Sequence, residues 1–163
     1  KPTIAVVNGI AMAGGMELVL ACDLVIAARG ARMGDGHANY GLLPGAGASV
    51  RLPRKIGPTR ANYLFFTGDL VMAEELVVPG LVNAVVEADA LDATAADWAA
   101  KIARRSPIGL ARMKQLARTS LDVSLADGIR QEHLMSALHV HSADRREGIA
   151  AFNEKRTPRF TGG

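Results

Sequence analysis

The stretch that decides the fold is Ala11-Met12-Ala13-Gly14-Gly15-Met16-Glu17, which follows the apolar run Ile4-Ala5-Val6-Val7-Asn8-Gly9. The apolar run predicts a strand over 3–9, and the paired glycines predict a turn into a buried helix over 14–22. The first N–H groups of a helix have no partner inside it, and the helix dipole adds positive potential there. A backbone N–H at this turn could therefore stabilise an oxyanion, while Glu17 could move a proton.

Composition places the chain among globular proteins. It has 163 residues, 49% hydrophobic and 4% aromatic, with a formal net charge of +3. This length supports one domain with an apolar core, and the composition argues against disorder. The small charge, without RNP-like, zinc-finger or lysine-rich segments, argues against a nucleic-acid partner. No apolar run approaches the roughly 20 residues of a membrane span, so no membrane partner is expected.

Cys22 is the only cysteine, which excludes an internal disulfide. It favours a reducing compartment, so we expect a cytoplasmic protein. In its apolar context, a buried thiol is a commoner role than a reactive one. The chain starts at Lys1-Pro2 and enters a strand at once. From this we expect a further N-terminal segment to accompany it.

Strand and helix signals alternate in the first half of the chain, and helical signals fill the second. We expect a strand over 24–28, a hairpin partner for it over 31–34, a glycine-rich loop after that, and a strand over 81–86. Helices are predicted over 47–56, 58–67, 73–77, 89–105, 107–120, 124–141 and 143–154. The composition shifts near residue 88, so we divide the chain into parts 1–88 and 89–163.

Several blocks of the sequence point to one family. They are Lys1-Pro2 through Asn8-Gly9, Ala13-Gly14-Gly15-Met16-Glu17, Cys22-Asp23, Gly41-Leu42-Leu43-Pro44-Gly45-Ala46-Gly47, Thr67-Gly68-Asp69 with Ala73-Glu74, Gly80-Leu81-Val82-Asn83, and the segment from Asp144 to Arg156. In their residues and in their order along the chain, these blocks resemble the sequence motifs of the crotonase (enoyl-CoA hydratase/isomerase) family. The resemblance implies an α/β fold, a crotonase-like ββα spiral. Residues 1–88 would form its later part, and 89–163 a helical region for trimerisation.

The resemblance also implies an acyl-CoA thioester as substrate, with no cofactor and no metal. The partners it implies are further copies of the chain, as a homotrimer or a dimer of trimers. The family's shared chemistry is stabilisation of a thioester enolate by two backbone N–H groups. Gly14 matches one donor, and the other belongs to the family's N-terminal half, which these residues lack. Glu17 matches the first of two catalytic glutamates; its alternative role is a solvent-facing residue at a helix start.

His37 stands where the second family glutamate would align, twenty positions after Glu17. An imidazole can act as a general acid or base near neutral pH, so a catalytic role and a merely hydrogen-bonding role both stay open. Asp35 and Tyr40 flank His37. Tyr40 is a candidate for substrate binding, although residues in a glycine-rich loop are more often structural. Phe152 and Lys155 match family positions that reach the CoA of a neighbouring subunit; the alternative for Lys155 is a solvated side chain.

The function that this resemblance favours is water addition to a 2-enoyl-CoA, within fatty acid metabolism. The N–H of Gly14 would polarise the thioester carbonyl, and Glu17 would act as base toward water. With only Glu17 retained from the glutamate pair, the same enolate could instead follow decarboxylation, C–C bond cleavage or hydrolysis. A third alternative is a crotonase-like scaffold that has lost turnover.

Overall fold

The computed structural model describes residues 1–163 and divides them into two compact units. One unit is Thr3–Trp98, and the other is Ala99–Gly163 together with Lys1–Pro2. The division falls inside helix α4 (Leu91–Ala103), beyond the boundary predicted at residue 88. The use of residues 89–163 for trimerisation stays a prediction. None of the helices combines the length and the hydropathy that a membrane crossing needs.

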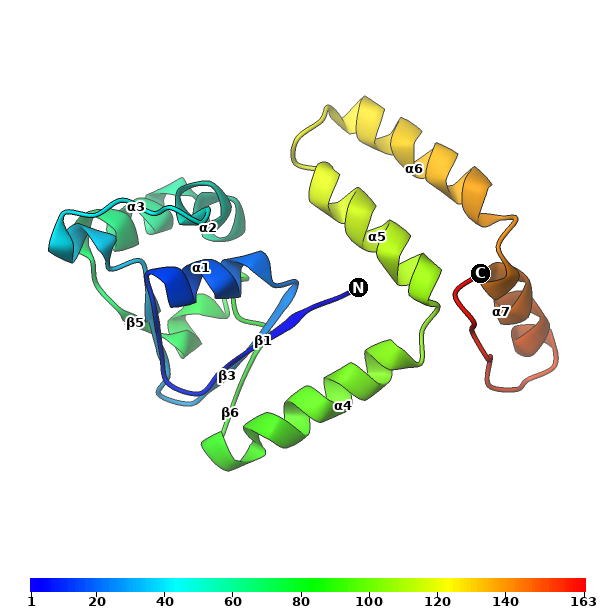
Figure 1. Cartoon of the computed structure of the whole chain (residues 1–163), viewed down its shortest axis with the longest axis horizontal. Helices are drawn as coiled ribbons and strands as arrows, with labels where there is room; N and C mark the ends of the chain where they lie inside the picture. The colour runs from blue at the N-terminus through cyan, green and yellow to red at the C-terminus, as the bar shows by residue number, and fades with distance from the viewer. The chain divides into compact units, whose positions relative to one another are not determined.

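Two three-stranded sheets form the framework of the unit Thr3–Trp98 (Figure 1). The first sheet is wholly parallel and has the order β1 (Ile4–Val7), β3 (Leu24–Ala28), β6 (Ala84–Val86). In the second sheet, β2 (Ile10–Met12) runs parallel to β4 (Arg32–Gly34), and β5 (Val71–Met72) runs antiparallel to β4. The apolar runs predicted as strands suit parallel strands, which are covered on both faces.

The strand pairing corrects two expectations. The strand predicted over 3–9 ends at Val7, and Ile10–Met12 forms a separate strand in the other sheet. The segment 31–34 does not fold back on β3 as a hairpin, because Arg32–Gly34 pairs in parallel with β2. The turn at Asn8-Gly9 explains both differences. It carries the chain from one sheet to the other, and the Gly9 carbonyl accepts a hydrogen bond from the Arg32 N–H at 3.1 Å.

Three helices of this unit confirm the predicted ones. They are α1 (Gly14–Ala21), α2 (Ala48–Ile56) and α3 (Pro58–Thr67); α1 packs on β2 and α2, and α2 packs on α3 (Figure 1). Short 3₁₀ turns follow at η1 (His37–Tyr40), η2 (Ala73–Leu76) and η3 (Ala88–Ala90). The turn η1 lies where only a loop was expected.

Apolar side chains from both sheets and from α1–α3 share one core. Its largest fully buried members are Met16, Val25, Met33, Leu52, Leu64, Leu76, Leu81 and Val82. A second cluster joins Ile26 and Ala28 to Leu91, with Trp98 packed beside them. Helix α1 buries one face only, because Leu18 is 73% exposed, which corrects the expectation of a helix buried on most sides.

The second unit is helical, as expected. It contains α5 (Pro107–Thr119), α6 (Leu125–His139) and α7 (Ala143–Asn153), and α5 and α6 pack along each other (Figure 1). Each of the three begins after a serine whose side chain accepts a hydrogen bond from the N–H three residues on. These serines are Ser106, Ser124 and Ser142. Such caps satisfy donors at a helix start, which explains where these helices begin.

Candidate active site

The candidate site assembles where β2 and β4 end. The two strands are parallel, and their last paired residues are Met12 and Gly34. Parallel strands end at the same edge of a sheet, which is where ligands bind in many α/β folds. Glu17 follows β2 on helix α1, whereas His37 follows β4 on the turn η1. Glu17 and His37 are thus brought to one edge by non-local pairing.

The turn between β2 and α1 presents a free backbone N–H. Ala13 has φ of 50° and ψ of −120°, an unfavourable conformation for a residue with a Cβ. Its N–H donates to the Asp35 carbonyl at 2.9 Å, which ties this turn to the segment after β4. Gly14 follows as the first residue of α1; it is exposed, and its N–H has no hydrogen-bond partner in the chain. This N–H is therefore available to a carbonyl oxygen of a ligand.

Glu17 is a buried carboxylate held by backbone groups. Its Oε1 accepts hydrogen bonds from the N–H of Ala46 at 2.6 Å and of Ala48 at 3.1 Å, at the start of α2. Burial raises the pKa of Glu17, but the bonds from Ala48 and Ala46 and the positive charge of His37 together lower that pKa below its ordinary value. Both bonds end on Oε1, which leaves Oε2 to accept a proton or a hydrogen bond from a ligand.

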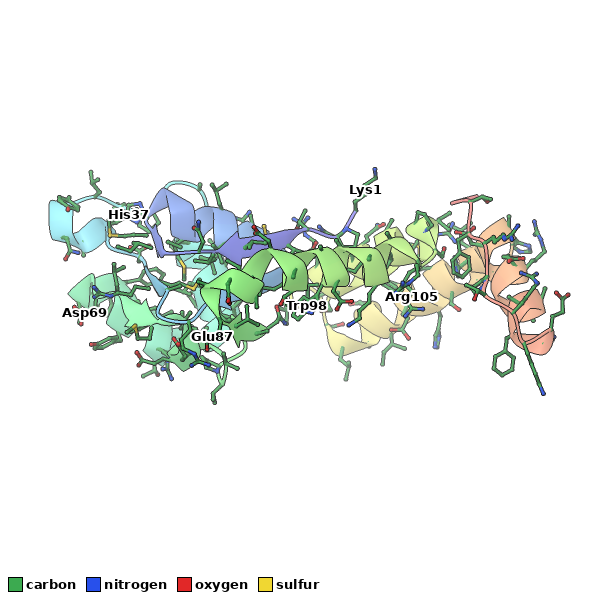
Figure 2. The ribbon with its side chains drawn as sticks, turned by 90° about the horizontal axis from the view of Figure 1, so that it is seen from below. Lys1, His37, Asp69, Glu87, Trp98 and Arg105 are labelled. Atoms are coloured by element: carbon green, nitrogen blue, oxygen red, sulfur yellow. The ribbon has the colours of Figure 1, made fainter.

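His37 is buried and paired with Asp35. Its Nδ1 lies 3.1 Å from Asp35 Oδ2, and its backbone N–H donates to the same oxygen at 3.3 Å. Gly36, between them, has φ of 69°, which a residue with a Cβ would adopt only with strain. Figure 2 shows His37 at the end of its unit away from Trp98. Because His37 lowers the pKa of Glu17 by its charge, the imidazole and the Glu17 carboxylate form one electrostatic cluster.

The remaining predicted site residues lie at the surface. Tyr40 ends η1 and is 72% exposed. Phe152 and Lys155 are exposed at the end of α7, in the other unit, so their contact with CoA stays a prediction. No group of three or more His, Cys, Asp or Glu side chains is arranged to hold a metal ion.

Sequence reasoning missed two parts of the site. One is the pair of N–H groups at Ala46 and Ala48, since backbone donors leave no residue-type signal. The other is the pairing of Asp35 with His37. A signal for it exists, because an Asp side chain often accepts from the N–H two residues on, above all next to a glycine. The bond from the His37 N–H to Asp35 is of this kind.

Comparison with known proteins identifies the family and the fold of the chain. The family description Enoyl-CoA hydratase/isomerase matches residues 1–163. The chain is 41% identical over 162 residues to 2,3-dehydroadipyl-CoA hydratase of Escherichia coli (strain K12). It is 44% identical over 165 residues to the human enoyl-CoA hydratase domain-containing protein 2, mitochondrial. Each alignment covers 99% of this chain, but only 64% and 56% of those two proteins.

Solved structures agree in fold. Enoyl-CoA hydratase from Bacillus anthracis superposes with a TM-score of 0.96 at 42% identity, covering 100% of this chain and 63% of that one. An enoyl-CoA hydratase structure from Geobacillus kaustophilus gives 0.95 at 40% identity, covering 99% and 63%. The expected α/β crotonase-like fold is thereby confirmed, over less than two thirds of the relatives' length. The chain belongs to the enoyl-CoA hydratase/isomerase family.

Proposed function

We propose that this chain carries a catalytic centre for the addition of water to a 2-enoyl-CoA thioester. The observation that carries the proposal is the Glu17 carboxylate, held through Oε1 by two backbone N–H groups, with a lowered pKa and a free Oε2. Such a group is ionised at neutral pH, as a base toward water must be. The unpaired N–H of Gly14 lies three residues before it on the same helix. The names of two relatives, 2,3-dehydroadipyl-CoA hydratase and a protein named for its enoyl-CoA hydratase domain, support the same reaction.

The proposed reaction divides the work between three groups. Oε2 of Glu17 takes a proton from water while the water oxygen bonds to C3 of the enoyl group. The electron pair of the double bond moves to the thioester oxygen, where the Gly14 N–H stabilises the enolate. His37 then takes up the proton from Glu17 and donates a proton to C2. One water molecule is added, and both side chains return to their starting states.

The second N–H donor is expected in the part of the family's length that these residues do not span. We further propose that CoA contacts Phe152 and Lys155 of a neighbouring subunit in a homotrimer or a dimer of trimers. Helix α6 supports an oligomer, because it buries no residue and exposes Leu125, Leu134 and Leu138. A cytoplasmic location and a place in fatty acid metabolism complete the proposal. The location rests on the lone Cys22 alone.

The test of this function is the hydration of crotonyl-CoA by the full-length protein. We expect the ultraviolet absorbance of the conjugated enoyl group to fall as the double bond is hydrated. We also expect 3-hydroxybutyryl-CoA to form. Calorimetric titration of the same ester measures binding separately from turnover. Saturable binding without turnover across several enoyl-CoA esters would contradict the proposal and favour a non-catalytic scaffold.

A second candidate function is decarboxylation, C–C cleavage or hydrolysis of an acyl-CoA. It is favoured by one observation, namely that His37 replaces the second family glutamate and is paired with Asp35. The variant His37→Glu separates the two candidates.

If hydration is the native reaction, His37→Glu lowers its kcat at least about 10-fold, because a proton donor is replaced by a carboxylate facing Asp35. Steady-state kinetics with crotonyl-CoA measure this change. The double variant Asp35→Asn/His37→Glu removes the repulsion and is expected to recover part of the rate. A large gain in hydration by His37→Glu alone would instead show that His37 directs the enzyme away from hydration.

A further inference from the structure

Asp35 is a buried carboxyl group for which the proposed reaction has no direct use. The residue is 1% exposed, and its backbone carbonyl accepts a hydrogen bond from the N–H of Ala13. The neighbouring Gly34 lies so close to the backbone carbonyl of Asp69 that a Cβ there would clash with it. Asp35 therefore has little freedom to move toward another partner or toward water.

The hydrogen bonds of the Asp35 side chain all lead to one residue. Oδ2 faces both Nδ1 and the backbone N–H of His37, whereas Oδ1 is buried without a hydrogen-bond partner in the chain. Asp144 shows the contrast, since both oxygens of that buried carboxylate accept hydrogen bonds. Burying a carboxylate costs free energy unless it is paired. Asp35 depends on His37 for that compensation.

The pairing determines which ring nitrogen of His37 holds the proton. A carboxylate only accepts hydrogen bonds, and a neutral imidazole has one N–H. The proton therefore resides on Nδ1, where it is donated to Asp35 Oδ2, and Nε2 is left with its lone pair. When Nε2 takes up a second proton, the ring forms an ion pair with Asp35. In both charge states, the nitrogen that exchanges a proton is Nε2.

We propose that Asp35 is a positioning residue that fixes the tautomer and orientation of His37, so that Nε2 is the atom that exchanges protons with Glu17 and the substrate. This proposal rests on the proposed function for its chemical consequence. The contacts between Asp35 and His37 that support the proposal do not depend on which reaction takes place. The charged groups that interact with the His37 ring are Asp35, from the segment after β4, by a direct contact, and Glu17, from α1, by its charge.

The direct test is nitrogen NMR of the full-length protein labelled with ¹⁵N-histidine, recorded at a pH where the rings are neutral. The variant His37→Gln identifies the two resonances of His37 by their disappearance. In the wild-type protein, Nδ1 is expected to give a protonated signal and Nε2 an unprotonated one. A wild-type spectrum with the proton on Nε2 would overturn the proposal without any variant.

The variant Asp35→Ala is expected to shift His37 to a mixture of tautomers and to lower kcat about 10²- to 10⁴-fold, since proton transfer by His37 then lacks its orientation. KM should change little, because Asp35 is too buried to touch the substrate. Asp35→Asn keeps the size of the side chain but removes its charge, and its amide can donate to Nδ1, so it should also shift the tautomer and lower kcat.

The matched control is Asp23→Asn, in which another aspartate of the same unit loses its charge beside Thr3. It should leave both the His37 spectrum and kcat unchanged. An Asp35→Ala variant with the wild-type tautomer and kcat would contradict the proposal. If instead the wild-type protein has no hydratase activity, the proposed function fails, while the NMR result still decides the role of Asp35.

Discussion

Replacing Glu17 by glutamine is expected to lower the kcat for crotonyl-CoA hydration about 10²- to 10⁴-fold while leaving the fold intact. A glutamine side chain keeps an Oε1 that can accept from the N–H groups of Ala46 and Ala48. Its amide cannot take a proton from water, so only the chemical step is lost. Steady-state kinetics and the melting temperature of the two proteins, measured side by side, check both parts of this expectation.

Two further variants separate catalysis from stability. Glu17→Ala removes the acceptor and leaves two N–H groups unpaired, so it should also lower the free energy of unfolding by about 2 kcal/mol. Glu75→Gln is the matched control, because the exposed Glu75 likewise accepts a backbone N–H, from Met72, through Oε1. It should retain wild-type kinetics. Equal rates for Glu17→Gln and the wild-type protein would remove Glu17 from the mechanism.

The lowered pKa of Glu17 also makes stability depend on pH with a definite sign. Its ordinary value is 4.5, and the folded value is lower. The ionised carboxylate therefore stabilises the folded chain fully above about pH 4.5, and this contribution is lost as the pH falls through the folded pKa. Glu17→Gln has no such group, so the acid sensitivity of its melting temperature should be smaller than that of the wild-type protein.

The second large effect is expected at Asp144, in the helical unit. This buried carboxylate accepts from the Ser106 hydroxyl at 2.6 Å and from the N–H groups of Thr161 and Gly162 at 2.8 and 3.0 Å. It thereby joins the start of α5, the first turn of α7 and the C-terminal residues. Asp144→Ala leaves these donors unpaired and is expected to lower the free energy of unfolding by about 3 kcal/mol. Denaturation in urea, followed by circular dichroism, measures the change.

Asp127 provides the comparison for this variant. It also lies in the first turn of a helix and accepts a serine hydroxyl, from Ser124 at 2.7 Å, but it is exposed. Asp127→Ala should therefore cost no more than about 1 kcal/mol. Similar losses in the two variants would contradict the structural role of Asp144. Burial raises the pKa of Asp144, but its hydrogen bonds outweigh burial and lower that pKa, so its contribution is lost as the pH falls below about 3.8.

The helices could be predicted from the sequence because their signals are local. Ser106, Ser124 and Ser142 cap α5, α6 and α7, and Pro58 lies at the first position of α3. The short strands could not be predicted in the same way. β2 and β5 have three and two residues, too few for a periodic pattern, and their partner β4 is distant in the sequence. The hairpin predicted over 31–34 was wrong for a similar reason, because a turn between two strands does not determine that those two strands pair with each other.

The site was predictable where it depends on residue type. Glu17 and His37 were expected to handle protons, and the structure brings them into one electrostatic cluster; their catalytic roles stay predictions. What fixes their geometry was not predictable. The anchors of Glu17 are backbone N–H groups at Ala46 and Ala48, and they reach it only through the packing of α1 on α2. A structural role was the commoner expectation for Asp35, beside one in lining the pocket, because nothing in the sequence shows that its Oδ1 is buried without a partner.

The most direct measurement of the central claim is the fate of isotopically labelled water. Crotonyl-CoA is incubated with the full-length protein in water carrying oxygen-18 and deuterium, and the products are analysed by mass spectrometry. The expected product is an intact thioester that has gained one solvent oxygen at C3 and one solvent deuterium at C2. Solvent oxygen found instead in a free carboxylic acid, together with released CoA, would contradict it, because the water would then have attacked the thioester.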